Sequence, residues 1–173
     1  THESGGAILT VLITGGMGFI GLHTARAFLD AGEDVVITWY QTWREPDFLK
    51  DEYGKRVTVE KADVSQAGVL RDLAQKHKVD RIMHLAVPGL GALDAAGDYH
   101  VNIDGLIGVL EAAREAEVKR IGIASSLAVY AGVPEGPFDE SVRMEMESNN
   151  PTAAYKKAWE VLSLAYGQRT GVE

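Results

Sequence analysis

Short apolar runs alternate with longer amphipathic stretches along most of the 173-residue chain. Five of the runs are rich in β-branched and aliphatic residues, which predicts strands over residues 7–14, 34–40, 56–64, 80–87 and 118–126. Elsewhere apolar residues recur every three or four positions, which predicts helices over residues 18–31, 65–77, 102–116 and 151–167. Strands that alternate with helices in this way are typical of a parallel sheet.

The same spacing indicates which helical residues face the core. The inward sets are Phe19, Leu22, Ala25, Ala27, Phe28 and Leu29 in the first helix, and Ile103, Leu106, Ile107, Leu110 and Ala113 in the third. Ser65 is a suitable N-cap for the second helix. Residues 88–97 are rich in glycine and alanine and are predicted to form a loop. His84 lies on an apolar strand, so we expect it to pack and not to act as a base.

We therefore expect one α/β domain over residues 1–173, built on a doubly wound parallel sheet of the Rossmann type. Right-handed crossovers place helices on both faces of such a sheet. The ligand crevice then lies at the carboxyl ends of the strands, where the strand order reverses.

Composition narrows the function classes. The net charge of −8 argues against a protein that binds the phosphate backbone of nucleic acids. Without cysteine the chain has no disulfide and no thiolate metal site, and no metal ligands are predicted. No stretch resembles a signal peptide or a membrane span. We expect a cytoplasmic protein that acts on a small molecule.

A glycine motif follows the first predicted strand. Gly15, Gly18 and Gly21 form a G-x-x-G-x-x-G pattern, and Phe19 and Ile20 within it open the first helix. The first glycine permits a tight turn, the second lets backbone N–H groups approach a pyrophosphate, and the third allows the helix to pack closely on the strand. The helix N-terminus adds positive potential for an anion. This strand–turn–helix context predicts a dinucleotide site.

The chain resembles the extended short-chain dehydrogenases/reductases, a family that includes nucleotide-sugar epimerases and dehydratases. Besides the glycines, four further segments match its motifs in the same order along the chain. They are "ADV" (residues 62–64), "HLAV" (84–87), "VNIDG" (101–105) and "SSLAVY" (125–130). The resemblance extends over nearly the whole chain and implies NAD or NADP as the cofactor.

The resemblance also assigns roles to residues. It places Asp63 and Val64 on the adenine, and it places Leu85, Ala86 and Val87 along the pyrophosphate and ribose. It makes Asn102 structural or close to the cofactor, and Ser126 the catalytic serine.

The end of the second strand departs from the family pattern. NAD-preferring relatives carry an acid there for the ribose hydroxyls, whereas this chain carries Trp39. Arg44 lies just downstream and could meet a 2′-phosphate, although the tryptophan could also pack on adenine. The choice between NAD and NADP stays open.

The last predicted helix contains a second departure. In the family, a tyrosine acts as acid/base, and a lysine four residues later binds the nicotinamide ribose. Reading back from the chain end aligns Lys156 with that lysine and Thr152 with the tyrosine. Reading forward from Pro151 aligns Tyr155 with the tyrosine and Trp159 with the lysine. The longer match favours Lys156, and helix geometry still allows Tyr155 to point toward the same cleft.

The resemblance implies an NAD(P)-dependent epimerase/dehydratase or reductase that transfers a hydride to or from a nucleotide sugar or related polyol. Its catalytic residues would be Ser126, Tyr155 and Lys156. The alternative is a catalytically degenerate dinucleotide-binding sensor or interaction protein, motivated by the shifted tyrosine. The family's C-terminal substrate region is largely absent from this chain. Family members often form homodimers through helices corresponding to residues 102–116 and 151–167.

Overall fold

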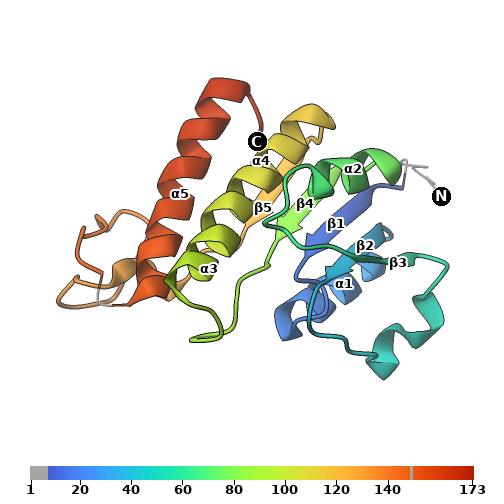
Figure 1. Cartoon of the computed structure of the whole chain (residues 1–173), viewed down its shortest axis with the longest axis horizontal. Helices are drawn as coiled ribbons and strands as arrows, with labels where there is room; N and C mark the ends of the chain where they lie inside the picture. The colour runs from blue at the N-terminus through green and yellow to red at the C-terminus, as the bar shows by residue number, and fades with distance from the viewer. Residues whose placement is uncertain (1–7, 149) are drawn as a thin grey trace, which may run out of the picture.

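A computed structural model describes residues 8–148 and 150–173 and contains one five-stranded sheet. Its strands are β1 (Thr10–Thr14), β2 (Asp34–Trp39), β3 (Val57–Lys61), β4 (Arg81–His84) and β5 (Arg120–Ile123). All pairings are parallel, and the order is β3-β2-β1-β4-β5 (Figure 1). The strand order therefore reverses between β1 and β4, which confirms the predicted doubly wound fold. In folds of this kind, ligands bind outside the carboxyl ends of the strands at the point of reversal.

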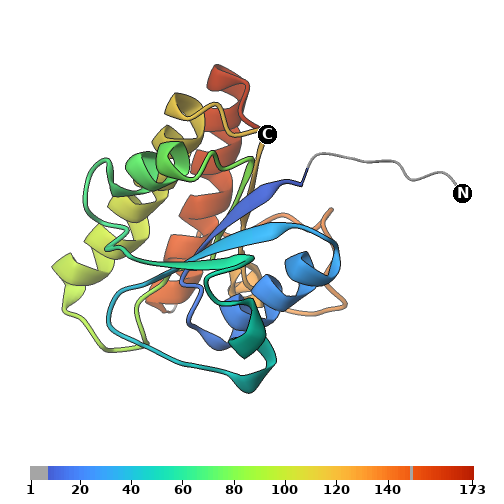
Figure 2. The same cartoon turned by 90° about the vertical axis from the view of Figure 1, so that its right-hand side faces the viewer.

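Helices cover both faces of the sheet. They are α1 (Phe19–Asp30), α2 (Val69–Lys76), α3 (Ala95–Tyr99), α4 (Gly105–Glu115) and α5 (Pro151–Thr170), with a π-helical segment η2 (His100–Asp104) and 3₁₀ turns η1 (Asp47–Glu52) and η3 (Leu127–Tyr130). Figure 2 shows α1 on the opposite side of the sheet from α2, α4 and α5.

The period-two alternation of β1 divides the core between these two layers. Leu12 joins a cluster with Val36, Ile82 and the buried residues of α2, α4 and α5. Val11 and Ile13 instead join a cluster with the residues of α1 and η1. Successive strand side chains point to opposite faces, so a fully apolar strand is what a sheet covered on both sides requires.

Several predicted details are wrong at the ends of elements. Ser65 does not cap α2, because its N–H and hydroxyl both donate to Asp63 Oδ1, at 3.0 and 2.7 Å. The helix begins instead after Gly68, which adopts a left-handed conformation. The predicted loop over 88–97 gives way to α3, whose N-cap Asp94 accepts from Gly97 N at 2.8 Å. Ala7, the first residue of the first predicted strand, lies outside the described residues.

Three residues predicted to face the core lie at the surface. Phe19 is 72% exposed because it is the first residue of α1, ahead of the part that packs on the sheet. Ile107 is 51% exposed on α4, and Ala27 is exposed on α1. The inward faces of both helices are therefore narrower than the sequence spacing predicts.

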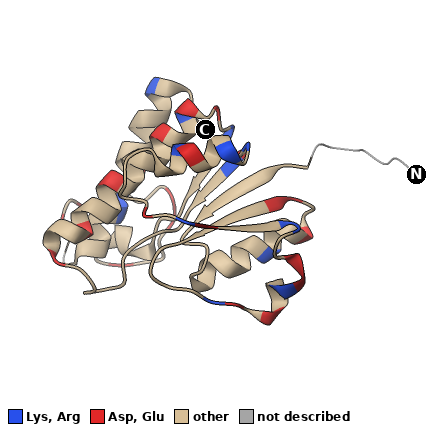
Figure 3. Cartoon of the chain, turned by 45° about the vertical axis from the view of Figure 1, so that its right-hand side comes forward, with Lys and Arg blue, Asp and Glu red and all other residues tan. Residues whose placement is uncertain are grey.

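Charged residues lie mainly on helices, loops and strand ends, with both signs interspersed (Figure 3). Several pair across elements; for example, Glu60 Oε1 lies 2.6 Å from Lys76 Nζ and from His77 Nε2. Within residues 8–148 and 150–173, no helix is both long and apolar enough to cross a membrane. The same part of the chain contains no group of three histidine, aspartate or glutamate side chains placed to hold a metal.

Candidate functional site

The turn between β1 and α1 has no room for side chains. Gly15 has a φ of +66°, and a Cβ there would lie 2.9 Å from the Cα of Ala86. A Cβ on Gly21 would lie 2.5 Å from the carbonyl oxygen of Gly15. Real Cβ atoms do not approach backbone so closely, so both positions require glycine. The turn is thereby packed against the end of β4 on one side and the first turn of α1 on the other.

The first turn of α1 is open to an anion. Gly18 is its N-cap, and no side chain from the described part of the chain caps it. A Cβ on Gly18 would approach only the carbonyl oxygen of Gly15, at 3.2 Å, so its outer side is free. The Phe19 and Ile20 side chains point into solvent, 72% and 65% exposed. Unpaired N–H groups at a helix start form a ready site for phosphate.

Thr14 ties the ends of β1 and β4 together. Its Oγ1 accepts from the N–H groups of Leu85 and Ala86, at 3.1 and 3.2 Å. The same hydroxyl lies 2.8 Å from His84 Nδ1. Because both lone pairs of Oγ1 are used, its own proton is left to donate to Nδ1, which assigns the histidine proton to Nε2. The short segment after β4 is thereby held beside the glycine turn.

His84 is fully buried and neutral. Burial, followed by the charge of Lys156, lowers the pKa of its imidazole to about 3. Its Nε2 has no hydrogen-bond partner in the described part of the chain. These observations agree with the prediction that His84 is a packed residue.

Asp63 and Val64 follow β3 at the same edge of the sheet. Asp63 is half-buried, and its Oδ1 holds the Ser65 N–H and hydroxyl in a turn. Val64 is buried, and a Cβ added to Gly105 of α4 would lie 3.1 Å from its Cγ2. Val64 is therefore a core residue, whereas Asp63 lies closer to solvent. Val87, after β4, is 49% exposed at this edge.

The end of β2 contains aromatic and basic side chains. The Trp39 ring lies 5.2 Å from the Trp43 ring, and Lys61 Nζ lies 5.1 Å from the Trp39 ring centroid. Arg44 makes no ion pair with any described residue and lines a hollow of about 380 Å³ together with Phe19 and other residues of α1 and η1. No acidic side chain occupies the last position of β2.

Asn102 has a structural role. It is 5% exposed, and its side-chain Nδ2 donates to the backbone carbonyl of Asp98 at 2.8 Å. Its own backbone carbonyl accepts from Trp159 Nε1 at 2.7 Å. It lies in η2, where the π-helical turn alters the regular helical hydrogen bonding. Both contacts join the start of α4 to α5.

Lys156 of α5 reaches the end of β5. Its Nζ donates to the carbonyl of Ala124 at 2.6 Å and lies 3.5 Å from the centroid of the Trp159 ring. The residue is 7% exposed, and burial lowers the pKa of its ammonium to about 8. Trp159 is completely buried, and its ring lies 4.8 Å from that of His84.

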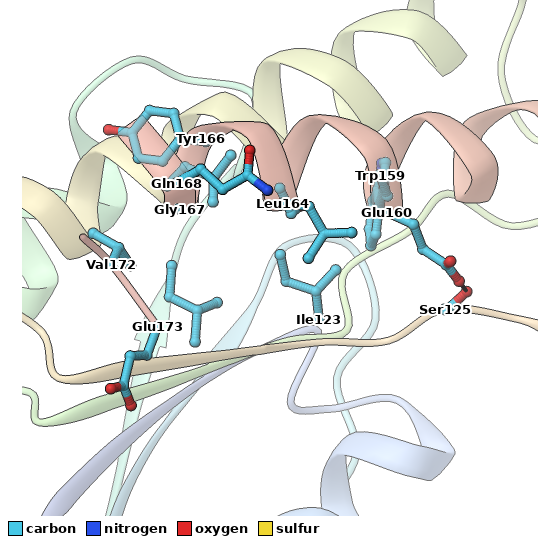
Figure 4. A pocket seen from close by; sticks show the side chains of 13 residues that line it. Ile123, Ser125, Trp159, Glu160, Leu164, Tyr166, Gly167, Gln168, Val172 and Glu173 are labelled. Carbon is cyan, nitrogen blue, oxygen red and sulfur yellow. Dashed lines mark hydrogen bonds between the residues drawn. The ribbon is translucent and has the colours of Figure 1, made fainter. Parts of the chain in front are cut away.

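The other two predicted catalytic residues lie apart from this contact. Ser126 Oγ accepts from Ala128 N at 3.2 Å and caps η3. Tyr155 is half-buried, and its hydroxyl makes no hydrogen bond with any residue that the structure describes. The neighbouring Ser125 hydroxyl donates to Glu160 Oε1 of α5 (Figure 4). The structure therefore joins Lys156 to β5, but it does not hydrogen-bond Ser126, Tyr155 and Lys156 to one another.

A larger pocket of about 520 Å³ lies between β5 and the C-terminal half of α5. Figure 4 shows Ile123, Leu164 and Gln168 among its lining side chains. At this edge of the sheet, Ile121 N donates to the carbonyl of Glu173 at 2.7 Å. None of the glycines of the β1–α1 turn lines this pocket, so the pocket is separate from that turn.

Sequence reasoning missed Thr14 and Trp159 as members of the site. Thr14 is a polar residue at the end of an otherwise apolar strand, and that position could have identified it. The sequence identifies Trp159 either as a tryptophan in the lysine position or as a packing residue. Its contacts to β4 and η2 depend on tertiary structure and leave no pattern in the sequence.

Comparison with known proteins gives consistent results. A model of the NAD dependent epimerase/dehydratase family matches residues 11–173. The chain is 29% identical over 154 residues to UDP-glucose 4-epimerase of Neisseria gonorrhoeae, covering 86% of this chain and 45% of that protein. It is 31% identical over 180 residues to UDP-glucuronate 4-epimerase 1 of Arabidopsis thaliana, covering 99% of this chain and 41% of that protein.

Solved structures show the same similarity. UDP-glucose 4-epimerase of Thermus thermophilus, in complex with NAD, superposes with a TM-score of 0.79 at 26% identity over 95% of this chain. UDP-N-acetylglucosamine 4-epimerase of Methanobrevibacter ruminantium, in complex with UDP-N-acetylmuramic acid, gives a TM-score of 0.82 at 26% identity over 96% of this chain. Each match covers 53% of the solved chain, so the present chain spans about half the length of these relatives.

Proposed function

Because the chain belongs to the NAD-dependent epimerase/dehydratase family, we propose that it forms the cofactor-binding half of an enzyme that epimerises a nucleotide sugar by hydride transfer. The observation that carries this proposal is the glycine turn, in which the backbone at Gly15 and Gly21 excludes side chains and the first turn of α1 is left open. The relatives named UDP-glucose 4-epimerase support the substrate class.

The residues after the strands fit the cofactor that the family uses. The backbone around Gly18, Phe19 and Ile20 would hold the pyrophosphate, and Asp63 would accept from the adenine amino group. Leu85, Ala86 and Val87 would line the ribose beside the glycine turn, while Asn102 and Val64 would support this surface from below. NAD, when bound, supplies the acceptor for a substrate hydride.

The predicted catalytic roles belong to three residues. Tyr155 would take the proton of the reacting hydroxyl, Ser126 would orient that hydroxyl, and Lys156 would bind the nicotinamide ribose.

Cofactor binding is tested by titrating the chain with NADH and following the fluorescence of the nicotinamide. We expect saturation in the micromolar range, and no binding of either NADH or NADPH would contradict the proposal. For glycine-to-alanine substitutions in the turn, Gly89→Ala is a suitable control, since a Cβ there meets only the Ala92 Cβ at an ordinary 3.6 Å.

Turnover is tested on the complete protein with UDP-glucose as the first substrate. We expect Tyr155→Phe to remove most of the activity with NADH affinity unchanged. Activity that survives this substitution would refute the tyrosine assignment. NADH binding without turnover, together with activity gained by Thr152→Tyr, would instead identify a degenerate catalytic site.

We also propose that the protein forms a homodimer through α4 and α5. Both helices expose apolar side chains, including Ile107 on α4 and Val161 and Leu164 on α5, which are 51%, 57% and 68% exposed. Light scattering of the complete protein should give twice the chain mass. A monomeric mass at micromolar concentration would contradict this proposal.

A further inference from the structure

Trp159 lies where three elements of the candidate site meet. Its indole N–H donates to the Asn102 carbonyl in η2 at 2.7 Å, and its ring lies 4.8 Å from the His84 ring at the end of β4. On its own helix, Lys156 Nζ lies 3.5 Å from the ring centroid. One fully buried side chain therefore contacts the lysine, the helix start and the strand beside the glycine turn.

Lys156 is a nearly buried cation without an anion. No carboxylate of the described residues lies within ion-pair distance of its Nζ, and the Ala124 carbonyl is its one hydrogen-bond acceptor there. An ammonium has three donors, so this carbonyl alone leaves it undersatisfied. An unpaired buried charge is costly, and the electron-rich face of an indole is the strongest aromatic partner for a cation. The Trp159 ring therefore replaces the missing anion.

The ring also lies beside a neutral group, the imidazole of His84. His84 Nδ1 accepts a hydrogen bond from the Thr14 hydroxyl, and the imidazole stays uncharged because of its burial. A protonated imidazole in this position would repel the Lys156 ammonium. The remaining titratable neighbours on α5 are engaged elsewhere or uncharged: Lys157 donates to the carbonyls of Ala131, Glu145 and Glu147, Glu160 accepts from Ser125, and Tyr155 is a phenol.

The contact is more specific than packing requires. Filling a core needs apolar volume, whereas this indole also directs its N–H to a backbone carbonyl in η2. That bond fixes the plane of the ring, so the face stays turned toward the ammonium. A phenylalanine would fill much of the space and offer a face, but it could not form the bond.

We propose that Trp159 is the positioning residue for Lys156, holding its ammonium charged and fixed at the carboxyl end of β5. Only the identity of the ligand that this ammonium contacts, the nicotinamide ribose, rests on the proposed function. The positioning itself does not depend on the cofactor and can be measured without it.

The direct test follows the Lys156 ammonium by ¹H–¹⁵N NMR of lysine side chains as a function of pH. Lys156→Met identifies the signal, which should titrate with a pKa of about 8 in the unmodified chain. Replacing tryptophan by fluorinated tryptophans weakens the electron-rich face with almost no change in shape. We expect the midpoint to fall stepwise with fluorination, by roughly one pH unit for a trifluorinated ring.

Substitutions give the second arm. Trp159→Phe should leave the midpoint of the Lys156 titration nearly unchanged. Trp159→Leu should lower this midpoint and weaken NADH binding at pH 7.5 by about tenfold. Trp43→Leu removes a tryptophan that is 46% exposed at the other end of the sheet's carboxyl side, and it should leave the Lys156 midpoint unchanged. A midpoint that is indifferent to fluorination, or that rises, would overturn the proposal even if Trp159→Leu does not fold. If the midpoint falls with fluorination but neither the unmodified chain nor any variant binds NADH, the positioning role stands and the proposed function fails.

Discussion

The glycine turn and helix α5 lie at the same edge of the sheet but are built differently. At the turn, the backbone makes the candidate site: Gly15 and Gly21 exclude side chains, and Thr14 Oγ1 accepts from two backbone N–H groups just after β4. At α5, side chains make the site, and Lys156 depends on a carbonyl and an aromatic ring. A backbone site tolerates almost no substitution, whereas a side-chain site can change its residues one at a time.

This contrast explains why the family pattern is complete at one region and altered at the other. A new side chain at Gly21 meets backbone at 2.5 Å, and no rotamer can relieve that. A new side chain on α5 faces neighbours that can adjust, so Trp159 can enter and form contacts to β4 and η2. We therefore expect substitutions at the turn to have the largest effects.

Gly21→Ala should have the largest effect of all. The added Cβ overlaps the Gly15 carbonyl and the Gly16 Cα, which forces α1 away from β1. We expect a loss of about 3 kcal/mol in the free energy of unfolding and at least a ~100-fold loss in NADH affinity. Urea unfolding and fluorescence titration measure the two quantities. Gly89→Ala makes the same chemical change at a position with room, and it should alter neither the free energy of unfolding nor the NADH affinity. Equal effects of the two substitutions would show that the close backbone around Gly21 does not exclude a side chain.

Burial of His84 predicts a smaller effect on the pH dependence of stability. Its pKa is about 3 in the folded chain and about 6.5 when unfolded, so between these values the unfolded chain binds more protons. Stability from this residue is therefore complete above pH 6.5 and decreases as the pH falls toward 3. Between pH 7 and pH 5 the expected loss is about 2 kcal/mol.

The measurement is urea unfolding at several pH values for the unmodified chain and for His84→Asn. The variant should lose the part of the acid sensitivity that His84 contributes, so its stability should change less between pH 7 and pH 5. His23→Asn alters an exposed histidine on α1 and serves as the control. Identical slopes for the unmodified chain and His84→Asn would show that the imidazole is not held neutral.

The order of strands and the glycine turn could be predicted because each rests on local patterns. Apolar runs of strand length are distinct, and Gly15, Gly18 and Gly21 follow one of them at a fixed spacing. The prediction for Ser65 is wrong because two capping geometries compete locally, and the Asp63 carboxylate prevails by accepting two bonds from Ser65. The role of Trp159 could not be predicted, because its hydrogen-bond partner is 57 positions away in the chain and His84 is farther still.

The end of the candidate site that would hold the adenosine ribose gives the smallest expected effect, and it tests whether backbone or side chains decide binding there. Here the last side chain of β2 is Trp39, and the exposed Arg44 nearby has no ion-pair partner among residues 8–148 and 150–173. If the side chains decide the cofactor, Arg44→Ser should weaken NADPH binding by roughly threefold to tenfold and leave NADH binding unchanged, since only NADPH carries the 2′-phosphate. Parallel titrations with both cofactors measure this, with Arg143→Ser as the matched control. An equal loss for NADH and NADPH would mean that Arg44 acts on a part common to both cofactors. No change for either would mean that the ribose end, like the glycine turn, is set by the backbone.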